Sequence, residues 1–273
     1  MNRIPRCSLS LAIFSIFSAG AIRADVLVAT YDFQNTLSAE QGGGVPALIP
    51  TDPLGENGFV TDTVDGQTRK VYAFNGSGNP PSQQAGLSFD NSGGLLPSNS
   101  YSIQMVFEFL DGNLNGWRRL VDVQNRQSDD GFYVDPSNNL DVYPVGAGSA
   151  AFANNAYEDV VLTDSSSGVV TGYLNGAKQF TLNTTVMDIN NPQNLINLFL
   201  DNDVGGGIGE FASGRIAEAR FYSGVLSDAE VAALDANPLS SPSPVPEPSF
   251  TILMGAAMAG LVLARRLRQL RLE

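Results

Sequence analysis

Carboxylates in a glycine-rich stretch, residues 198–210, are the side chains whose types and spacing could do chemistry. Asp201 and Asp203 lie two positions apart, and Glu210 follows a run of glycines. Calcium takes about six to eight oxygen ligands in flexible geometry, which these carboxylates and the oxygen of Asn202 could supply. The spacing after Asp203 differs from that of an EF-hand loop. The alternative is a polar, glycine-rich loop of a β-sandwich that binds no cation.

Two further groups of residues could bind a ligand. The adjacent acids 129–130 are a second place for a cation, although a solvated turn explains them equally simply. Trp117 is followed by two arginines, and an aromatic ring beside such donors can stack on a sugar and bind its hydroxyls. The apolar residues within 120–123 favour a structural strand for Trp117 instead. The same two interpretations apply to Tyr133 and Tyr143.

Hydrolysis of a sugar bond needs two carboxylates roughly 5–9 Å apart. Glu158 and Asp159 are adjacent, so on a strand they face opposite sides of the sheet. Glu218 has no carboxylate two residues further on. The chain has no histidine, which excludes Ser-His-Asp catalysis and histidine-based zinc or iron sites. We therefore expect a protein that is not an enzyme, with a glycoside hydrolase as the less favoured alternative.

The charge of the chain limits its partners. Asp and Glu number 28 against 15 Lys and Arg, which gives a net charge of −13 at pH 7. An acidic surface excludes nucleic acid as a partner and suits solubility outside the cell. It is also compatible with cation binding, and calcium is the one cofactor that the sequence suggests. The only cysteine, Cys7, lies so close to the N-terminus that a processed chain would contain no disulfide.

Short alternating or apolar runs, separated by Gly, Asn, Asp, Pro and Ser, predict β-strands throughout residues 26–222. The clearest is 100–110, in which apolar residues occupy alternate positions. Asn175 and the glycine after it are typical of a type I′ hairpin turn. The one convincing helix begins after Ser227, which forms a capping box with Glu230. Many short strands and one late helix predict an all-β, antiparallel sandwich.

The first 24 residues have the order of a secretory signal peptide. Arg3 and Arg6 precede the apolar stretch 9–17, and small residues follow it. We expect export through the Sec translocon and cleavage after Ala24, with Ala21 as the other candidate position. A buried N-terminal helix is the alternative interpretation of the same residues.

The C-terminal residues also have three parts in a fixed order. Residues 240–248 read SSPSPVPEP, a linker that should be extended and solvated. The apolar stretch 250–264 follows, and an arginine-rich end closes the chain. As a helix that stretch reaches roughly 22 Å at ~1.5 Å per residue, short of a ~30 Å hydrocarbon core. Residues 249–273 are therefore a marginal transmembrane helix, whose arginines would stay on the cytoplasmic side.

This terminus resembles the PEP-CTERM sorting signal of Gram-negative bacteria. The resemblance implies processing by an exosortase and transient anchorage in the inner membrane. It further implies delivery to the cell envelope, the cell surface or the extracellular matrix. A simple membrane anchor is the alternative. The residues that match the signal are Val245, Pro246, Glu247, Pro248, Arg265 and Arg266.

The domain between the two ends, residues 25–239, resembles LamG-like, concanavalin A-like domains. The segments that carry the resemblance are 31–37, 115–134, 160–180 and 214–234; the last of them reads GRIAEARFYSGVLSDAEVAAL. The resemblance implies a jelly-roll sandwich and a non-enzymatic module that binds a glycan or a matrix component. A structural matrix or biofilm protein without a defined ligand is the alternative, because a fold does not fix a function.

Overall fold

The computed structural model describes residues 25–239, apart from Asn113, Pro192 and Gly206. No helix in this described part is long and apolar enough to cross a membrane. The predicted C-terminal helix lies outside it, as do the residues predicted to direct export. Those residues are Ala24, Val245, Pro246, Glu247, Pro248, Arg265 and Arg266.

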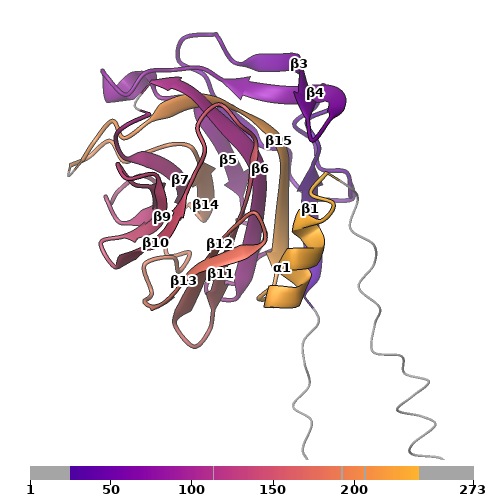
Figure 1. The fold of residues 1–273 in the computed structure, drawn as a ribbon, viewed down its shortest axis with the longest axis vertical. Helices are drawn as coiled ribbons and strands as arrows, with labels where there is room; N and C mark the ends of the chain where they lie inside the picture. The colour runs from indigo at the N-terminus through magenta and orange to yellow at the C-terminus, as the bar shows by residue number, and fades with distance from the viewer. Residues whose placement is uncertain (1–24, 113, 192, 206, 240–273) are drawn as a thin grey trace, which may run out of the picture.

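Two antiparallel sheets pack face to face around one core, with an eight-stranded sheet opposite a seven-stranded sheet (Figure 1). The first sheet has the strand order β13-β12-β11-β6-β15-β4-β3, and β1 also pairs with β15. Its strands are β1 (Val26–Tyr31), β3 (Gly58–Val64), β4 (Gln67–Phe74), β6 (Tyr101–Gly112), β11 (Glu158–Ser165), β12 (Val169–Leu174), β13 (Ala177–Asn183) and β15 (Ala212–Ser223).

The second sheet has the strand order β10-β9-β8-β7-β14-β5-β2. A short 3-10 helix, η1, precedes β5, and the helix α1 follows the last strand of the chain. The bounds of these elements are β2 (Ile49–Thr51), η1 (Pro81–Gln83), β5 (Gly86–Asp90), β7 (Arg118–Asp122), β8 (Gly131–Val134), β9 (Asn139–Tyr143), β10 (Gly146–Ala151), β14 (Leu195–Leu198) and α1 (Asp228–Asp235).

The last strand, β15, lies in the middle of the first sheet, between β6 and β4. It is antiparallel to both, and β1 pairs with its other end. Strands far apart in the sequence are thus neighbours, as in jelly-roll sandwiches. The predicted all-β, antiparallel sandwich is confirmed.

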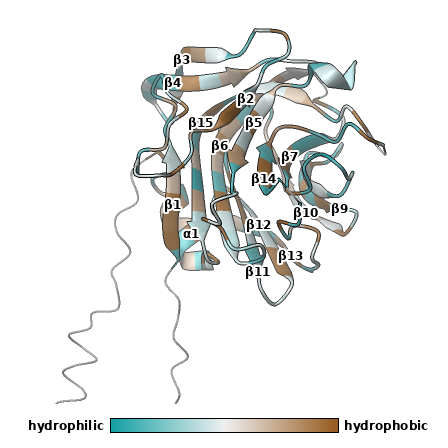
Figure 2. Cartoon of the chain, turned by 180° about the vertical axis from the view of Figure 1, so that it is seen from behind, coloured by the Kyte–Doolittle hydropathy of each residue, from teal (hydrophilic) through white to brown (hydrophobic). Residues whose placement is uncertain are grey.

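Alternation along the strands builds the core. In β6, Ile103, Met105, Phe107 and Phe109 point between the sheets and are fully buried. Successive side chains of a strand point to opposite faces, so the residues between them lie on the outer face. Figure 2 shows the resulting change between hydrophobic and hydrophilic positions along the strands. The predicted strand 100–110 is confirmed.

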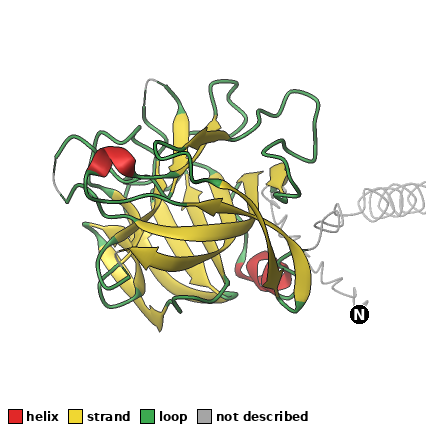
Figure 3. Cartoon of the chain, turned by 90° about the horizontal axis from the view of Figure 1, so that it is seen from above, coloured by secondary structure: helices red, strands yellow, loops and turns green. Residues whose placement is uncertain are grey.

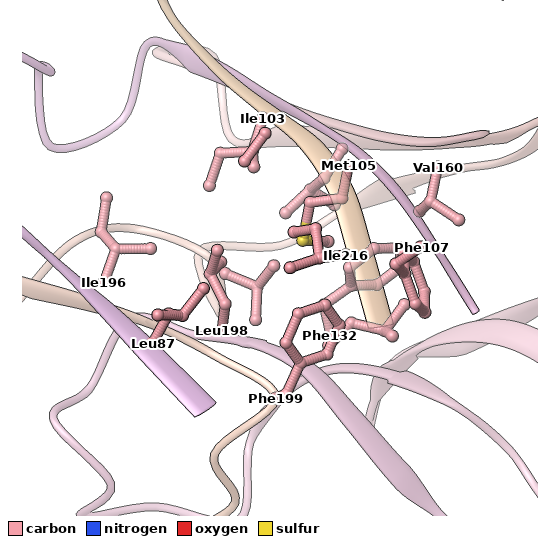
Figure 4. Close-up of a cluster of buried hydrophobic side chains, with 14 of the residues drawn as sticks. Leu87, Ile103, Met105, Phe107, Phe132, Val160, Ile196, Leu198, Phe199 and Ile216 are labelled. Carbon is pink, nitrogen blue, oxygen red and sulfur yellow. The ribbon is translucent and has the colours of Figure 1, made fainter. Parts of the chain in front are cut away.

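Aliphatic and aromatic side chains together fill the space between the sheets (Figure 4). The rings of Phe74 and Phe199 are stacked, with centroids 4.2 Å apart. The ring of Phe107 lies 5.1 to 5.2 Å from those of Phe109, Phe152 and Phe199. Aromatic rings bury large apolar areas and favour such offset and edge contacts. The domain between the predicted export signals has no cysteine, so this core stabilises it without disulfides.

The predicted local signals form as expected. Asn175 and Gly176 both have positive φ angles, of 48° and 70°, which a type I′ turn requires. Ser227 caps α1 in a capping box with Glu230. Val231 of α1 packs on Tyr173 and Tyr222 at the outer face of the first sheet. Figures 1 and 3 show this helix beside the sheet.

Replacing Phe107 by alanine should lower the free energy of unfolding by about 3–5 kcal/mol, because a buried ring is lost and a cavity forms. Urea unfolding followed by the fluorescence of the single tryptophan measures this loss. The control is Val60→Ala, since Val60 is 36% exposed on β3 and should change stability by only about 0.5 kcal/mol. Equal losses in the two variants would contradict the assignment of the core.

Candidate functional site

Three carboxylates from different parts of the chain meet beside β7 and β14, two strands in the middle of the second sheet. Asp129 lies in the connection between β7 and β8, Asp201 follows β14, and Glu210 precedes β15. One oxygen of each lies within 4.8 Å of the others. Asp201 is fully buried and the other two are partly buried. Carboxylate oxygens at this separation could bind one hard cation together.

The guanidinium group of Arg119, on β7, holds this region together from beneath. It is buried and donates hydrogen bonds to three backbone carbonyls of the β7–β8 connection, at distances of 2.8 to 3.1 Å. It also pairs with the buried carboxylate of Asp122 at 3.0 Å. The β7–β8 connection therefore wraps around the positively charged guanidinium group of Arg119. The carbonyls belong to Ser128, Asp129 and Asp130.

Asp201 is held in place on both sides of its carboxylate. Oδ1 lies 3.5 Å from Arg119 and accepts a hydrogen bond from the Tyr133 hydroxyl at 3.2 Å. Oδ2 accepts one from the backbone N–H of Glu210 at 2.9 Å. The backbone N–H of Asp201 itself donates to the side-chain oxygen of Gln84 at 2.7 Å. The segments before and after the glycine-rich loop are thus joined through one aspartate.

The site holds more negative charge than its one close arginine balances. Burial raises the pKa of Asp201 to about 6, although the positive charge of Arg119 opposes the shift. Burial also raises the pKa of Glu210 to about 8, and the negative charges of Asp201 and Asp129 add to it. Ionisation of these two carboxyl groups is unfavourable in the folded protein, and a bound cation would stabilise their ionised form.

Asp203 does not join the other carboxylates. Its carboxylate lies 3.8 Å from Arg126, and its side chain is 46% exposed. Asn202, between them in sequence, donates from its side-chain amide to Oδ1 of Asp129 at 3.2 Å. The chain bends after Asp201, so residues two apart no longer face the same way. The predicted trio is therefore split: the structure brings Asp201 and Glu210 together with Asp129 instead of Asp203.

The two arginines after Trp117 are not surface donors. Arg118 is fully buried, with its guanidinium 5.4 Å from the ring of Phe109, and Arg119 is the buried hub described above. Trp117 itself is partly exposed and is not among the residues of the apolar core. Both guanidinium groups are engaged inside the protein, so the two arginines are not available to a sugar, and residues 118–122 form the strand β7, in agreement with the favoured interpretation of this segment.

Aromatic rings connect the carboxylates to the surface. Tyr133 stacks against the guanidinium of Arg119 at 4.6 Å, and its ring is 5.6 Å from that of Trp117. Trp117 in turn makes an edge contact, at 5.4 Å, with Tyr143, which is 36% exposed. The buried end of this row is polar, and at its outer end Trp117 and Tyr143 are partly exposed.

An open cavity of about 590 Å³ lies next to Glu210, between the residues before η1 and the end of the glycine-rich loop. Gly78 and Gly209 meet there so closely that a Cβ on Gly78 would lie 2.1 Å from the Gly209 carbonyl oxygen. Only glycine allows this approach. Ile208, on the rim of the cavity, is 47% exposed.

Comparison with known families agrees with this architecture. The profile of the concanavalin A-like lectin/glucanases superfamily matches residues 81–232, more than half of the chain. The chain belongs to this superfamily. The PEP-CTERM protein-sorting motif matches residues 244–269, which implies export, membrane anchorage before processing, and processing by an exosortase. No curated protein matches the chain.

Solved structures show the same fold at low identity. Domain 4 of AbnA, a GH43 extracellular arabinanase from Geobacillus stearothermophilus in complex with arabinotriose, has a TM-score of 0.54 at 21% identity, covering 77% of this chain and 98% of that one. The binding domain of botulinum neurotoxin DC in complex with SialylT has a TM-score of 0.54 at 15% identity. That match covers 79% of this chain and 51% of the toxin chain, so this chain spans about half of it.

In this concanavalin A-like domain, two of the three acids considered for sugar hydrolysis, Asp159 and Glu218, belong to a network on the outer face of the first sheet. The third, Glu158, accepts a hydrogen bond from Asn175 instead. Both oxygens of Asp159 accept hydrogen bonds from Gln104 at 3.0 Å. Glu218 pairs with Arg220 at 2.5 Å, and Arg220 donates to Gln104 at 2.9 Å. Burial raises the pKa of Asp159 and of Glu218 to about 7. Alternate polar positions on β6, β11 and β15 were the sequence signal for this network, which we did not predict.

Replacing Arg119 by methionine should destabilise the domain by about 3–5 kcal/mol, because Asp122 and Asp201 would be left buried without their cation. Urea unfolding at pH 7 measures the loss. The control is Lys178→Met, which removes an exposed ion pair with Asp228 and should cost less than about 1 kcal/mol. If Arg119→Met lowers the free energy of unfolding no more than Lys178→Met does, the guanidinium group of Arg119 is not what holds this region together.

Proposed function

We propose that this protein is an exported cell-surface or extracellular-matrix module that binds a glycan without modifying it. The superfamily supports the proposal, and so do two solved neighbours: an arabinanase domain in complex with arabinotriose and a toxin binding domain in complex with SialylT. The sorting motif supports delivery to the envelope or beyond it after exosortase processing. A fold alone does not identify a ligand, so the site has to carry the proposal.

The partly exposed pair Trp117 and Tyr143 is the observation that carries it. Aromatic rings with an apolar body and one wet side are suited to partners that combine apolar faces with hydroxyl groups, as sugars do. Asp141 lies two residues before Tyr143, on the same face of β9, and pairs across the sheet with Tyr133. Burial raises the pKa of Asp141 to about 6, so near neutral pH its carboxylate can accept hydrogen bonds from sugar hydroxyls.

The burial and the hydrogen-bond partners of Asp159 and Glu218 support a non-enzymatic role. Asp159 and Glu218 are buried and engaged with Gln104 and Arg220. A glycoside hydrolase needs one carboxylate to donate a proton and another to act at the opposite face of the sugar. Side chains committed to a buried network reach neither position. Hydrolysis of a polysaccharide panel that is abolished by substituting one of these acids would overturn this part of the proposal.

Replacing Trp117 by alanine should weaken glycan binding about tenfold or more, since loss of a central aromatic contact costs roughly 1–2 kcal/mol. A glycan array that includes arabino-oligosaccharides and sialylated glycans identifies the ligand, and titration calorimetry then compares the variants. Trp117→Phe is the matched control, because it keeps a ring and should retain most of the affinity. Tyr143→Ala should weaken binding in the same direction.

Two outcomes would argue against this proposal. Saturable binding to no glycan on a broad array would favour the second candidate, a structural matrix protein without a defined ligand. Saturable binding that is unchanged in Trp117→Ala and in Tyr143→Ala would place the sugar elsewhere. The glycine-lined cavity beside Glu210 is then the next surface to substitute, starting with Ile208.

We further propose that Asp129, Asp201 and Glu210 hold a calcium ion beside this surface. Their oxygens lie within 4.8 Å of one another, and the pKa of Glu210 is raised by the neighbouring negative charges as well as by burial. Calcium accepts carboxylates from separate loops and tolerates irregular geometry. The ion would fix the glycine-rich loop against the β7–β8 connection.

Calcium should raise the thermal midpoint of the protein, and a chelator should lower it, because a ligand that binds only the folded state stabilises it. In Glu210→Gln the part of this response that belongs to the site should disappear. The matched control is Asp203→Asn, which removes a nearby carboxylate that faces Arg126 and should leave the response intact. A response that Glu210→Gln leaves unchanged would contradict the site.

A further inference from the structure

A second group of acids lies at the far side of the core, and its centre is Asp164 on β11. Val160 and Leu162 of the same strand point into the core, and Asp164 continues that inward face. Its cross-strand neighbours are Tyr101 on β6 and Val170 on β12. The side chain is 0% exposed, and neither carboxylate oxygen has a hydrogen-bond partner.

An ionised carboxylate in this position is costly. Moving such a charge out of water costs several kcal/mol unless a counter-ion or hydrogen bonds replace the lost hydration. Among the described residues, no lysine or arginine contributes to the electrostatic environment of Asp164. The hydroxyl of Tyr101 does not compensate either, because it donates to the carbonyl of Met187.

Asp188 supplies a second carboxylate at the same place. It lies in the connection between β13 and β14, so close to Asp164 that the two carboxyl groups would hydrogen-bond to each other if one of them carried a proton. Its Oδ1 is also buried without a partner. Burial and the negative charge of Asp188 raise the pKa of Asp164 to about 8. Three buried oxygen atoms of this pair, both of Asp164 and Oδ1 of Asp188, thus have no hydrogen-bond partner.

The backbone holds Asp188 over Asp164. Its own N–H donates to the carbonyl of Thr185 at 3.1 Å, and the N–H of Ile189 donates to the carbonyl of Ser98 at 2.7 Å. The flanking side chains of Met187 and Ile189 are buried in the core. The connection therefore cannot move the two acids apart without breaking these contacts. The residue Asp188 is itself partly exposed, which gives a route from solvent.

We propose that Asp164 and Asp188 hold a divalent cation of the calcium type at this end of the sandwich. Three unpartnered carboxylate oxygens are a hard ligand set, and calcium accepts a carboxylate through both of its oxygens. Water or backbone carbonyls would complete the coordination. The ion would replace the missing counter-charge and tie the β13–β14 connection to the ends of β6 and β11. This site is separate from the cluster around Asp201 and does not depend on glycan binding.

The test counts bound calcium. The full-length chain is stripped with chelator and equilibrated with Ca²⁺, and the metal content per chain is measured by mass spectrometry. All variants are built on Glu210→Gln, which removes the other proposed site. In that background we expect one calcium per chain, and none after adding Asp164→Asn or Asp188→Asn. The matched control is Asp65→Asn, which alters an exposed turn residue with a positive φ angle that asparagine also adopts.

Thermal unfolding provides a second measurement that also reports folding. Calcium at about a hundred times its dissociation constant should raise the midpoint in the Glu210→Gln background by roughly 5–10 °C. Adding Asp164→Asn should abolish this rise. In chelator, the same variant should melt at or above the temperature of its parent, because a buried carboxyl group without a hydrogen-bond partner has been replaced by a neutral amide.

Two results would overturn the proposal. A calcium content that stays at one per chain after Asp164→Asn would place the ion elsewhere. The second result is a Glu210→Gln protein that binds no calcium and whose thermal midpoint changes with neither Ca²⁺ nor Mg²⁺. It would show that the carboxyl groups of Asp164 and Asp188 share a proton instead. Neither result bears on glycan binding or on the site at Asp201.

Discussion

The buried guanidinium group of Arg119 is the interaction on which the candidate site depends. It fixes the β7–β8 connection through three carbonyls, and it balances Asp122 and Asp201 from below. Tyr133 packs on the same group and carries the contact outward to Trp117. The aromatic surface and the carboxylate cluster therefore share one anchor. A ligand at either place would bind to a surface whose geometry is set by a single buried charge.

Acids with raised pKa values recur throughout the sandwich. Burial is the largest cause for Asp159, Asp164, Asp201, Glu210 and Glu218 alike. A carboxyl group whose pKa in the folded state exceeds its value of about 4 in the unfolded chain binds its proton more tightly when folded. Its contribution to stability is therefore present at low pH and is lost as the pH rises from about 4 to about 8. A bound cation opposes this loss, because it stabilises the ionised form.

The sequence predicted features that depend on neighbours along the chain. Alternation identified β6, and the Asn175 turn and the Ser227 capping box formed as expected. The sequence also singled out Asp201 and Glu210, whose carboxylates lie close together in the structure. Strand β10, Gly146–Ala151, was missed because its small residues carry no alternation. The third carboxylate was expected to be Asp203, but it is Asp129, which belongs to a different loop. Spacing along the sequence gives no information on the distance between residues of separate loops.

An exported domain without cysteine has to hold its connections by other means. The core stabilises the sheets, but in the connections Asp129 and Asp201 meet Glu210 beside a single arginine, and Asp188 meets Asp164 without a basic partner. Ions at both proposed sites would join connections that are distant in sequence, as disulfides do in other exported domains. Unlike a disulfide, an ion stabilises the folded state in proportion to its free concentration. The stability of this domain would then be set by the calcium concentration of the compartment to which the sorting signal delivers it.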